Sequence, residues 1–525
     1  MVTPTPPSGP ETRLPAPSVA TLTARWLARS KGTIVAIAGV GAVLSGLVGY
    51  YTTYKTVVST QDRAVSDSPA NTDVNSIAVL PFVNMSSDKD QEYFSDGLTE
   101  ELLNQLAQVP KLKVIARTSS FSFKGKQMDI AAIARALKVG HVLEGSVRKS
   151  GNTLRITAQL IRTSDSTHLW SQTYDRQMTD VFAVQDEISQ AVVGALRDKL
   201  LPQQTVARTA GQTTNPQAYT EYLLGRSYFN QFNLEGYKLS KAALQKAIAL
   251  DPGYALAYAE LALSEVNISE YEPKSADIFA GQTRALAWAE KAIALEPELI
   301  HGYIARSRIR QSMLDFAGAL ADAKHALKIN PNDSGAHLRY GKVLTSTGPL
   351  DDALKALTKA TALDPLNVEA IERAGLVWHY KDDPANAQAA YTQALQLQPN
   401  YQDAQYDMGI SFLLQGDKAK AQEMFDKMSP DSRNYGNAML QMSATSAVES
   451  DAALTAYIEA HPTHNYSIAV LYALRGKTDK AFESLQLAYE SRQVALNVKF
   501  DRRLNSLHSD PRFNGLLKKM GLGEL

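Results

Sequence analysis

One interval, 34 residues long, recurs through the second half of this chain and limits the folds open to it. Pro297, Pro331, Pro365 and Pro399 are each separated by 34 residues. One glycine series and two alanine series keep the same interval: Gly341, Gly375 and Gly409; Ala319, Ala353, Ala387 and Ala421; Ala292, Ala326, Ala360 and Ala394. This pattern indicates one supersecondary unit stacked many times, because a single unit cannot bury its hydrophobic face alone.

The residue types in the repeat indicate paired antiparallel helices. Glycine and alanine let two helix axes approach closely, large side chains such as Tyr391 and Phe425 fill the space between them, and proline ends the second helix. With these residues at this interval, the chain resembles the tetratricopeptide (TPR) repeat family. The resemblance implies an all-α superhelix, or solenoid, over residues 216–500, and a scaffold that binds another protein.

The ends of the array are less regular than its middle. Two further repeats precede the regular series, and they end at Pro252 and Pro297. These prolines are 45 residues apart, which places eleven extra residues in an inserted loop near 270–281. The interval degrades after Asp431, although residues 466–491 still predict a helix pair. We expect residues 501–525 to form a capping helix, because an end repeat has no neighbour to cover its core. Since each repeat should contact only its neighbours, we also expect the array to fold without the rest of the chain.

The first helix of each repeat is expected to line a concave groove with exposed side chains. Counted from the small residue of each repeat, this face comprises Arg308, Leu338, Lys342, Glu372, Leu376, His379, Tyr406 and Ile410. A surface that mixes apolar anchors with charges suits a peptide or a helix of another protein. The alternative is a solvated face without a partner. The sequence therefore predicts a protein partner in the TPR groove.

An uncharged and largely apolar stretch, residues 32–54, predicts a transmembrane helix. A helix needs roughly 20 such residues to cross the hydrocarbon core of a bilayer. A cleaved signal peptide is the alternative, but its apolar region is shorter and begins nearer the start of the chain. Gly41, Ser45 and Gly49 recur at every fourth position, a spacing that allows a homodimer through this helix.

The charges on the two sides of this span predict its orientation. Arg13, Arg25, Arg29 and Lys31 precede it, whereas the basic residues that follow are diluted by aspartates. The positive-inside rule therefore places a short tail, residues 1–31, in the cytoplasm, and everything after residue 55 outside.

Residues 76–200 predict a compact α/β sandwich domain, preceded by a polar linker over residues 55–75. Ser95 is expected to cap a helix with Leu98, Leu102 and Leu106 on one face. Further helices are expected at 130–137 and 181–200. Strands are expected at 76–82, 112–116, 141–149, 154–160 and 168–174, the first two parallel and the last three an antiparallel meander.

Short motifs in this region carry a second resemblance. They are SIAVLPF (76–82), YFSDGLTEEL (93–102), VIARTSSF (114–121), KGK (124–126), LEGSVR (143–148), LWSQTYDR (169–176) and QDEI (185–188). With them, residues 76–200 are similar to the TolB-N-terminal-like domain that precedes TPR arrays in bacterial signalling proteins. Together with the predicted span and its orientation, the resemblance implies a single-pass protein of the bacterial inner membrane with its bulk in the periplasm.

Members of that family commonly carry an adenylate cyclase domain or a winged-helix DNA-binding domain ahead of the membrane helix. In this chain residues 1–31 stand in that place, so the resemblance does not transfer either activity. One basic and aromatic loop in the α/β domain is a second candidate site, for an anionic ligand or a partner: Arg117, Phe121, Lys124 and Lys126. The alternative is a solvated loop with Phe121 or Phe123 tucked into the core.

The composition argues against several classes of function. Lys plus Arg and Asp plus Glu each total 54, so a nucleic-acid partner is not expected. The absence of cysteine excludes disulfides, thiolate zinc sites, iron–sulfur clusters and cysteine nucleophiles. No GxxxxGK[ST], HExxH or GxSxG motif occurs, and we expect neither an enzyme nor a cofactor or metal site.

Two functional hypotheses remain after these exclusions. The first is a membrane-anchored, protein-binding scaffold or sensor module that acts through its TPR repeats. The second is a regulatory subunit of a signalling system whose cyclase or DNA-binding output is a separate protein.

Overall fold

The computed structural model describes residues 73–523, apart from residues 108, 110–111, 201–210, 272–274, 443–445 and 493–495. Several predictions lie outside the described residues: the tail at 1–31, the transmembrane helix at 32–54 with Gly41, Ser45 and Gly49, and most of the linker at 55–75. Within the described part of the chain, no helix is both long and apolar enough to cross a membrane.

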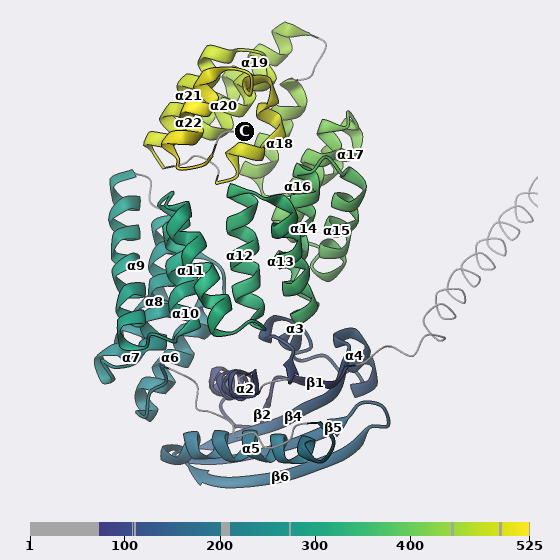
Figure 1. Ribbon diagram of the computed structural model, residues 1–525, viewed down its shortest axis with the longest axis vertical. Helices are drawn as coiled ribbons and strands as arrows, with labels where there is room; N and C mark the ends of the chain where they lie inside the picture. Colours follow the sequence, from purple (N-terminus) through teal and green to yellow (C-terminus); the bar gives the residue numbers. More distant parts are fainter. Residues whose placement is uncertain are drawn as a thin grey trace, which may run out of the picture. The chain divides into compact units, whose positions relative to one another are not determined.

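The N-terminal part of this structure is built on a mixed sheet (Figure 1). Its strands are β1 (Asp73–Val79), β2 (Val83–Asn84), β3 (Lys113–Val114), β4 (Val139–Ser150), β5 (Thr153–Arg162) and β6 (Thr167–Gln177). They lie in the order β3-β1-β4-β5-β6, with β2 beside β4. β1 pairs in parallel with β3 and β4, whereas β4, β5 and β6 form an antiparallel meander. The mixed sheet therefore has the strand directions that the sequence predicts.

Alternation along β1 divides its side chains between two hydrophobic layers. Ile77 and Val79 pack with the helices α2 (Glu92–Ala107) and α5 (Val181–Leu200). Ala78, and Leu80 directly after the strand, pack instead with α4 (Ile130–Leu137). Both faces of β1 are thus covered, as expected of a strand with parallel neighbours.

The predicted helix cap at Ser95 is wrong. α2 begins at Glu92, directly after a short 3-10 turn, η1 (Lys89–Gln91), so Ser95 lies inside the helix. Its side chain is buried, and its carbonyl accepts a hydrogen bond from Thr99 Oγ1 at 2.8 Å.

The remainder of the described chain is a stack of antiparallel helix pairs (Figure 1). The pairs are α6 (Pro216–Phe229) with α7 (Leu234–Leu250), α8 (Ala255–Ser269) with α9 (Ser275–Leu295), α10 (Ile300–Ser312) with α11 (Phe316–Ile329), α12 (Ser334–Thr347) with α13 (Leu350–Leu363), α14 (Val368–Tyr380) with α15 (Pro384–Leu397), α16 (Gln402–Leu414) with α17 (Lys418–Asp426), α18 (Pro430–Met442) with α19 (Ala447–Ala460), and α20 (Asn465–Leu474) with α21 (Thr478–Glu490).

The recurring small residues lie where the two helices of a pair touch. A Cβ atom added to Gly375 of α14 would lie 2.7 Å from Tyr391 Cε1 of α15. The same addition at Gly409 of α16 would lie 2.5 Å from Phe425 Cε1 of α17. Any side chain at these positions would push the helices apart, which confirms the predicted reason for the glycine series.

The inserted residues of the second pair extend a helix. α9 has 21 residues, whereas α11 of the next pair has 14. The expectation of an inserted loop near 270–281 is therefore wrong for most of that range, because residues 275–281 form the first two turns of α9.

The C-terminal end contains three short helices in place of the single capping helix that the sequence predicts. Two short 3-10 helices, η3 (Val498–Phe500) and η4 (Arg502–Leu507), precede α22 (Pro511–Lys519). The chain breaks between them because Asp501 and Asp510 accept hydrogen bonds from the following backbone N–H groups and so start new turns. α22 then packs Phe513 and Leu517 into the core of the last helix pairs.

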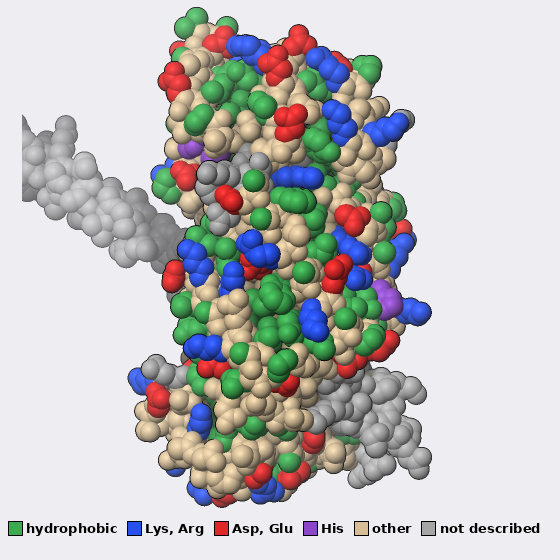
Figure 2. Space-filling model, turned by 90° about the vertical axis from the view of Figure 1, so that its left-hand side faces the viewer, with side chains coloured by type: hydrophobic (Ala, Val, Ile, Leu, Met, Phe, Trp, Pro, Cys, Tyr) green, Lys and Arg blue, Asp and Glu red, His purple; other side chains and the backbone are tan. Residues whose placement is uncertain are grey.

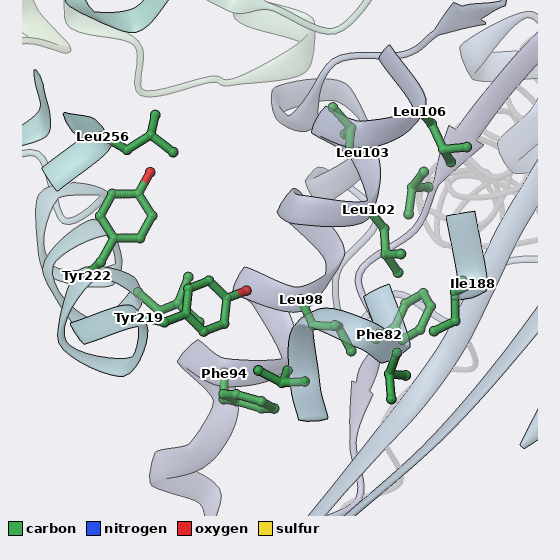
Figure 3. Packing of buried hydrophobic residues seen from close by; sticks show 14 of the residues in the cluster. Phe82, Phe94, Leu98, Leu102, Leu103, Leu106, Ile188, Tyr219, Tyr222 and Leu256 are labelled. Atoms are coloured by element: carbon green, nitrogen blue, oxygen red, sulfur yellow. The ribbon is translucent and has the colours of Figure 1, made fainter. Parts of the chain in front are cut away.

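The sheet domain and the repeats share one hydrophobic core. Tyr219, Tyr222 and Leu223 of α6 belong to the same cluster as Leu98 of α2. Figure 3 shows the Tyr219 ring extending towards Leu98 of α2 and the Tyr222 ring towards Leu256. Gly97 provides the room for this contact, since a Cβ atom there would lie 2.2 Å from Leu223 Cδ2.

A second contact joins the sheet domain to the middle of the array. Asp364, just after α13, accepts a hydrogen bond of 2.9 Å from the backbone N–H of Ser119 in the short helix α3 (Arg117–Phe121). Ser119 Oγ in turn accepts one of 2.7 Å from the N–H of Leu366. The expectation that each repeat contacts only its neighbours is therefore wrong.

Candidate functional site: the groove of the repeats

The eight predicted groove residues lie on the first helices of four successive pairs, α10, α12, α14 and α16. Six of them line two adjoining cavities: Arg308, Lys342, Leu376, His379, Tyr406 and Ile410. The other two do not reach either cavity. Leu338 packs against the cluster between α12 and α13, and Glu372 is fully buried.

The expected exposure of this face is wrong for half of these residues. Glu372 is 0% exposed, Leu376 and His379 are 5% exposed and Ile410 is 6% exposed. Burial and, after it, the nearby charge of Arg502 lower the pKa of His379 to about 4. The groove is therefore not an open surface along its length.

The chain's own C-terminal end covers the groove through residues 496–507, which we call the terminal segment. Phe500 stacks on Tyr380 of α14 with ring centroids 5.9 Å apart. Asn497 donates a hydrogen bond to the Tyr380 hydroxyl, and Arg503 donates one to the Tyr406 hydroxyl of α16. These contacts join residues about a hundred positions apart in sequence, which the 34-residue interval does not reveal.

One cavity, of about 600 Å³, is bordered by a concentration of positive charge, and we call it the basic cavity. Five cationic side chains line it: Arg308, Arg339, Lys342, Arg373 and Arg492. Ile278, Leu376 and Leu496 form the apolar part of its wall. The sequence prediction missed three of these cations: Arg339 and Arg373, which lie one position after Leu338 and Glu372, and Arg492, which lies outside the regular repeats.

Only some of these cations have a carboxylate partner. Glu270 pairs with Arg308, Glu369 pairs with Lys342, and Arg373 pairs with both Glu372 and Asp403. Arg339 and Arg492 have no such partner among the described ion pairs. The charge of Lys342 lowers the pKa of Glu369 to about 2. Burial, and then repulsion from Arg308, lowers the pKa of Arg339 to about 9. The cavity is therefore a site where further positive charge is disfavoured.

The second cavity, of about 310 Å³, has a different character, and we call it the tyrosine cavity. Four tyrosines and three aspartates line it: Tyr380, Tyr406, Tyr435, Tyr466, Asp403, Asp407 and Asp501. Burial raises the pKa of Asp407 to about 6 and raises that of its neighbour Glu372 well above the usual range. Arg373 and Leu376 border both cavities, so the groove runs from a basic end to an acidic and aromatic end.

The loop predicted as a second candidate site is largely neutralised by α2. The Arg117 guanidinium lies 4.1 Å from the centre of the Phe121 ring and pairs with Glu100. Lys124 Nζ lies 2.6 Å from Asp96 Oδ2. Lys126 lies over Phe123, which is tucked into the core as the alternative hypothesis proposed. The structure thus brings Arg117 and Phe121 together, but it gives the cations internal partners.

Comparisons with known proteins support the two-part organisation. Residues 72–191 match the family described as the HilA/YgeH-like transcriptional regulator, second domain. Residues 314–374 and 380–443 match the tetratricopeptide repeat family. The chain therefore contains TPR repeats and a HilA-like domain, whereas these matches do not show the expected TolB-N-terminal-like domain.

Two curated proteins are similar to parts of the chain. It is 42% identical over 220 residues to "Putative adenylate cyclase 3" of Rhizobium meliloti (strain 1021), and this match covers 42% of this chain and 37% of that protein. It is 28% identical over 109 residues to serine/threonine-protein phosphatase 5 of Mus musculus, which covers 21% of this chain and 20% of that protein. The chain thus spans well under half the length of each relative.

The crystal structure of a thermophilic TPR protein of Thermus thermophilus matches 37% of this chain and 99% of that protein, at 20% identity and a TM-score of 0.33. Within the described residues, no cluster of three or more His, Asp or Glu side chains has a geometry that could hold a metal ion.

Proposed function

We propose that this chain is a protein-binding scaffold or sensor module that acts through the groove of its TPR repeats. One observation carries the proposal: first helices from four successive pairs turn side chains towards two adjoining cavities. A solenoid offers such a groove already formed, so binding costs little ordering entropy. The tyrosine cavity supplies amphipathic rings of the kind that anchor protein interfaces.

The site of contact is tested by photo-crosslinking in cells. A photoreactive phenylalanine analogue replaces Asp403, whose side chain is 55% exposed at the tyrosine cavity. The matched control replaces Glu423, which is 63% exposed on the outer helix α17 of the same pair. We expect crosslinked products, identified by mass spectrometry, from position 403 but not from position 423. Equal crosslinking at both positions would refute the groove as the binding surface.

We also propose that the chain is held in a bacterial inner membrane by residues 32–54, with its bulk in the periplasm. The support is the uncharged span and the basic residues that precede it. Alkaline phosphatase fused after residue 525 should be active, whereas a reporter that needs the cytoplasm should be inactive there. The opposite pattern would place the repeats in the cytoplasm. We further propose that the sheet domain is a TolB-N-terminal-like domain, and that the membrane helix forms a homodimer through Gly41, Ser45 and Gly49.

A regulatory subunit of a signalling system is the second candidate function. It is favoured by the 42% identity to a relative named as an adenylate cyclase and by the HilA-like domain. Affinity purification from detergent-solubilised membranes should then recover a cyclase or a DNA-binding protein with the chain. Cyclic AMP synthesis by the purified chain alone would refute both candidates and indicate an enzyme.

A further inference from the structure

We propose that the basic cavity binds a small organic oxyanion, a ligand that carries at least two phosphate or carboxylate charges. This site goes beyond the proposed binding of a protein partner and does not depend on it. The proposal rests on the balance of charges around the cavity, on a buried polar group without a partner, and on the way the terminal segment closes the space.

The charges around the cavity do not balance within the described residues. Arg339 donates a hydrogen bond to the Gln311 amide oxygen, and Arg492 donates one of 3.4 Å to the Met313 carbonyl. Neither guanidinium has a carboxylate partner among the described ion pairs. On the face in view in Figure 2, by contrast, Lys and Arg side chains are interspersed with Asp and Glu side chains. The cavity is therefore a local excess of positive charge in a chain whose formal net charge is zero.

Arg339 is the strongest single indication of a ligand. Its side chain is 5% exposed, it borders the cavity, and its Nε has no hydrogen-bond partner among the described residues. Glu369 attracts Arg339 from nearby but is already paired with Lys342. Burying a guanidinium without an ion-paired carboxylate of its own is costly, because the distant attraction does not repay desolvation in full. A bound oxyanion would supply the missing charge, since planar guanidinium groups bind phosphate and carboxylate through paired hydrogen bonds.

The size and closure of the cavity favour a small molecule over a long peptide. A volume of about 600 Å³ falls within the range of roughly 300–1,000 Å³ that is typical of small-ligand pockets. Arg492, Leu496 and Asn497 form one wall of it, and Phe500 and Arg503 fix the terminal segment across the groove beyond. A long peptide would have to displace these contacts, whereas a small ligand would not.

The apolar wall indicates the kind of oxyanion. Ile278, Leu376 and Leu496 are aliphatic, and the described lining contains no aromatic ring on which a nucleobase could stack. We therefore expect a compact organic phosphate or polycarboxylate rather than a nucleotide.

The test measures anion binding to the purified full-length chain in detergent. Pyrophosphate and citrate represent the two sources of charge, a hexaglutamate peptide represents an acidic partner, and sodium chloride at the same ionic strength is the reference. Melting temperature and isothermal titration calorimetry report binding. We expect pyrophosphate or citrate to raise the melting temperature above the chloride reference, and the better of the two identifies phosphate or carboxylate as the preferred group.

A matched pair of variants locates the site. Arg308 and Arg310 lie on the same helix, are each 24% exposed and each pair with an acid, but only Arg308 borders the cavity. We expect Arg308→Gln to weaken anion binding about tenfold or more, the usual cost of a lost hydrogen bond to a charged group. Arg310→Gln should change the affinity less than twofold.

Arg339→Gln separates a ligand-binding role from a purely structural one. If Arg339 serves a ligand, this variant in chloride buffer melts at the same or a higher temperature than the native chain and loses its response to the anion. If Arg339 is structural, the variant melts lower and keeps the response, and the proposal is refuted. No stabilisation by either anion, stabilisation by hexaglutamate alone, or equal losses from the two α10 variants would also refute it. None of these outcomes alters the crosslinking result expected at position 403.

Discussion

Gly375 lies at the closest contact between the helices of one pair, where a single methyl group has a defined consequence. A Cβ atom there would lie 2.7 Å from Tyr391 Cε1 and 3.1 Å from Ala390 Cβ, and Tyr391 is fully buried. We expect Gly375→Ala to destabilise the fold by about 1–3 kcal/mol through overpacking. The measurement is thermal or urea unfolding followed by circular dichroism.

The control for this change is Gly515 of α22, a helical glycine with nothing within 4 Å of an added Cβ atom. Gly515→Ala should be neutral or stabilise by up to about 1 kcal/mol, because alanine favours the helix. If both changes had the same effect, the close approach at Gly375 would not be what the repeat requires.

Glu101 is a buried carboxyl group whose titration opposes folding near neutral pH. Burial raises its pKa to about 7, and this outweighs the lowering by Arg226 and by a hydrogen bond from Gln212. The folded chain therefore keeps a proton that the unfolded chain releases near pH 4.5, so stability falls as the pH rises from about 4.5 to about 7. The loss at pH 8 is up to about 3 kcal/mol.

Glu101→Gln should remove this dependence. Arg226 keeps Glu100 and Glu260 as partners, so the variant leaves no unpaired cation. We expect its melting temperature to exceed that of the native chain at pH 8 and to equal it at pH 4.5. The exposed change Glu423→Gln should leave the difference between the two pH values unaltered, and a variant that melts lower at pH 8 would contradict the argument.

At the scale of whole elements, the terminal segment closes the groove by contacts that can be loosened. Phe500 stacks on Tyr380, and Arg503 donates a hydrogen bond to the Tyr406 hydroxyl. Because the chain has no cysteine, Leu376→Cys introduces a single thiol, which is buried and borders the cavities that Leu496 and Asn497 of this segment also line. We expect the added changes Phe500→Ala and Arg503→Ala to speed maleimide labelling of this thiol several-fold.

A thiol at Leu357, which is buried between α12 and α13 and away from the segment, is the control. The same two changes should leave the labelling of Leu357→Cys unaltered. Faster labelling at both positions would mean that the repeats themselves loosen, and no change at either would mean that the segment does not cover the groove.

The elements differ in how well the sequence predicts them, for physical reasons. The helix at 130–137 and the strands of the meander are specified by local periodicity, and the structure has them as α4, β4, β5 and β6. The cap at Ser95 was mispredicted because a preceding 3-10 turn moves the start of α2 to Glu92. The terminal segment has no periodic pattern, and its contacts with Tyr380 and Tyr406 exist only once the repeats are stacked.

The candidate site is likewise predicted only where the regular repeat determines the position of a residue. The position of the small residue in each repeat is enough to place Arg308, Lys342 and Leu376 on the inner helices. It does not predict that Arg339 is buried without an ion-paired carboxylate, because that depends on which acids reach it from neighbouring repeats. Nor does it predict the closure of the cavity by Arg492 and Leu496, which come from beyond the regular array.

At the scale of the whole molecule, the sheet domain and the repeats are bound together at two places. Tyr219, Tyr222 and Leu223 of α6 are at most 3% exposed in a core that they share with α2. Ser119 of α3 is hydrogen-bonded to Asp364, which fixes the turn between α13 and α14. The array is thus held at its start and at its middle by a domain outside it.

This arrangement predicts that the isolated array of repeats is less stable than the sequence alone indicates. A fragment that begins at residue 211 loses the partners of Tyr219 in α5 and of Leu223 in α2, at a cost on the order of 4 kcal/mol, and leaves Asp364 without Ser119. We expect it to melt well below a fragment that begins at residue 73 and to bind a hydrophobic dye. Substituting Tyr219 and Leu223 by Gln and Ser in the shorter fragment should abolish dye binding, because these positions then face water, whereas Tyr222 stays packed on Tyr254, directly before α8. Equal melting temperatures for the two native fragments would mean that each repeat is stabilised by its neighbours alone, and that the shared core contributes nothing to the array.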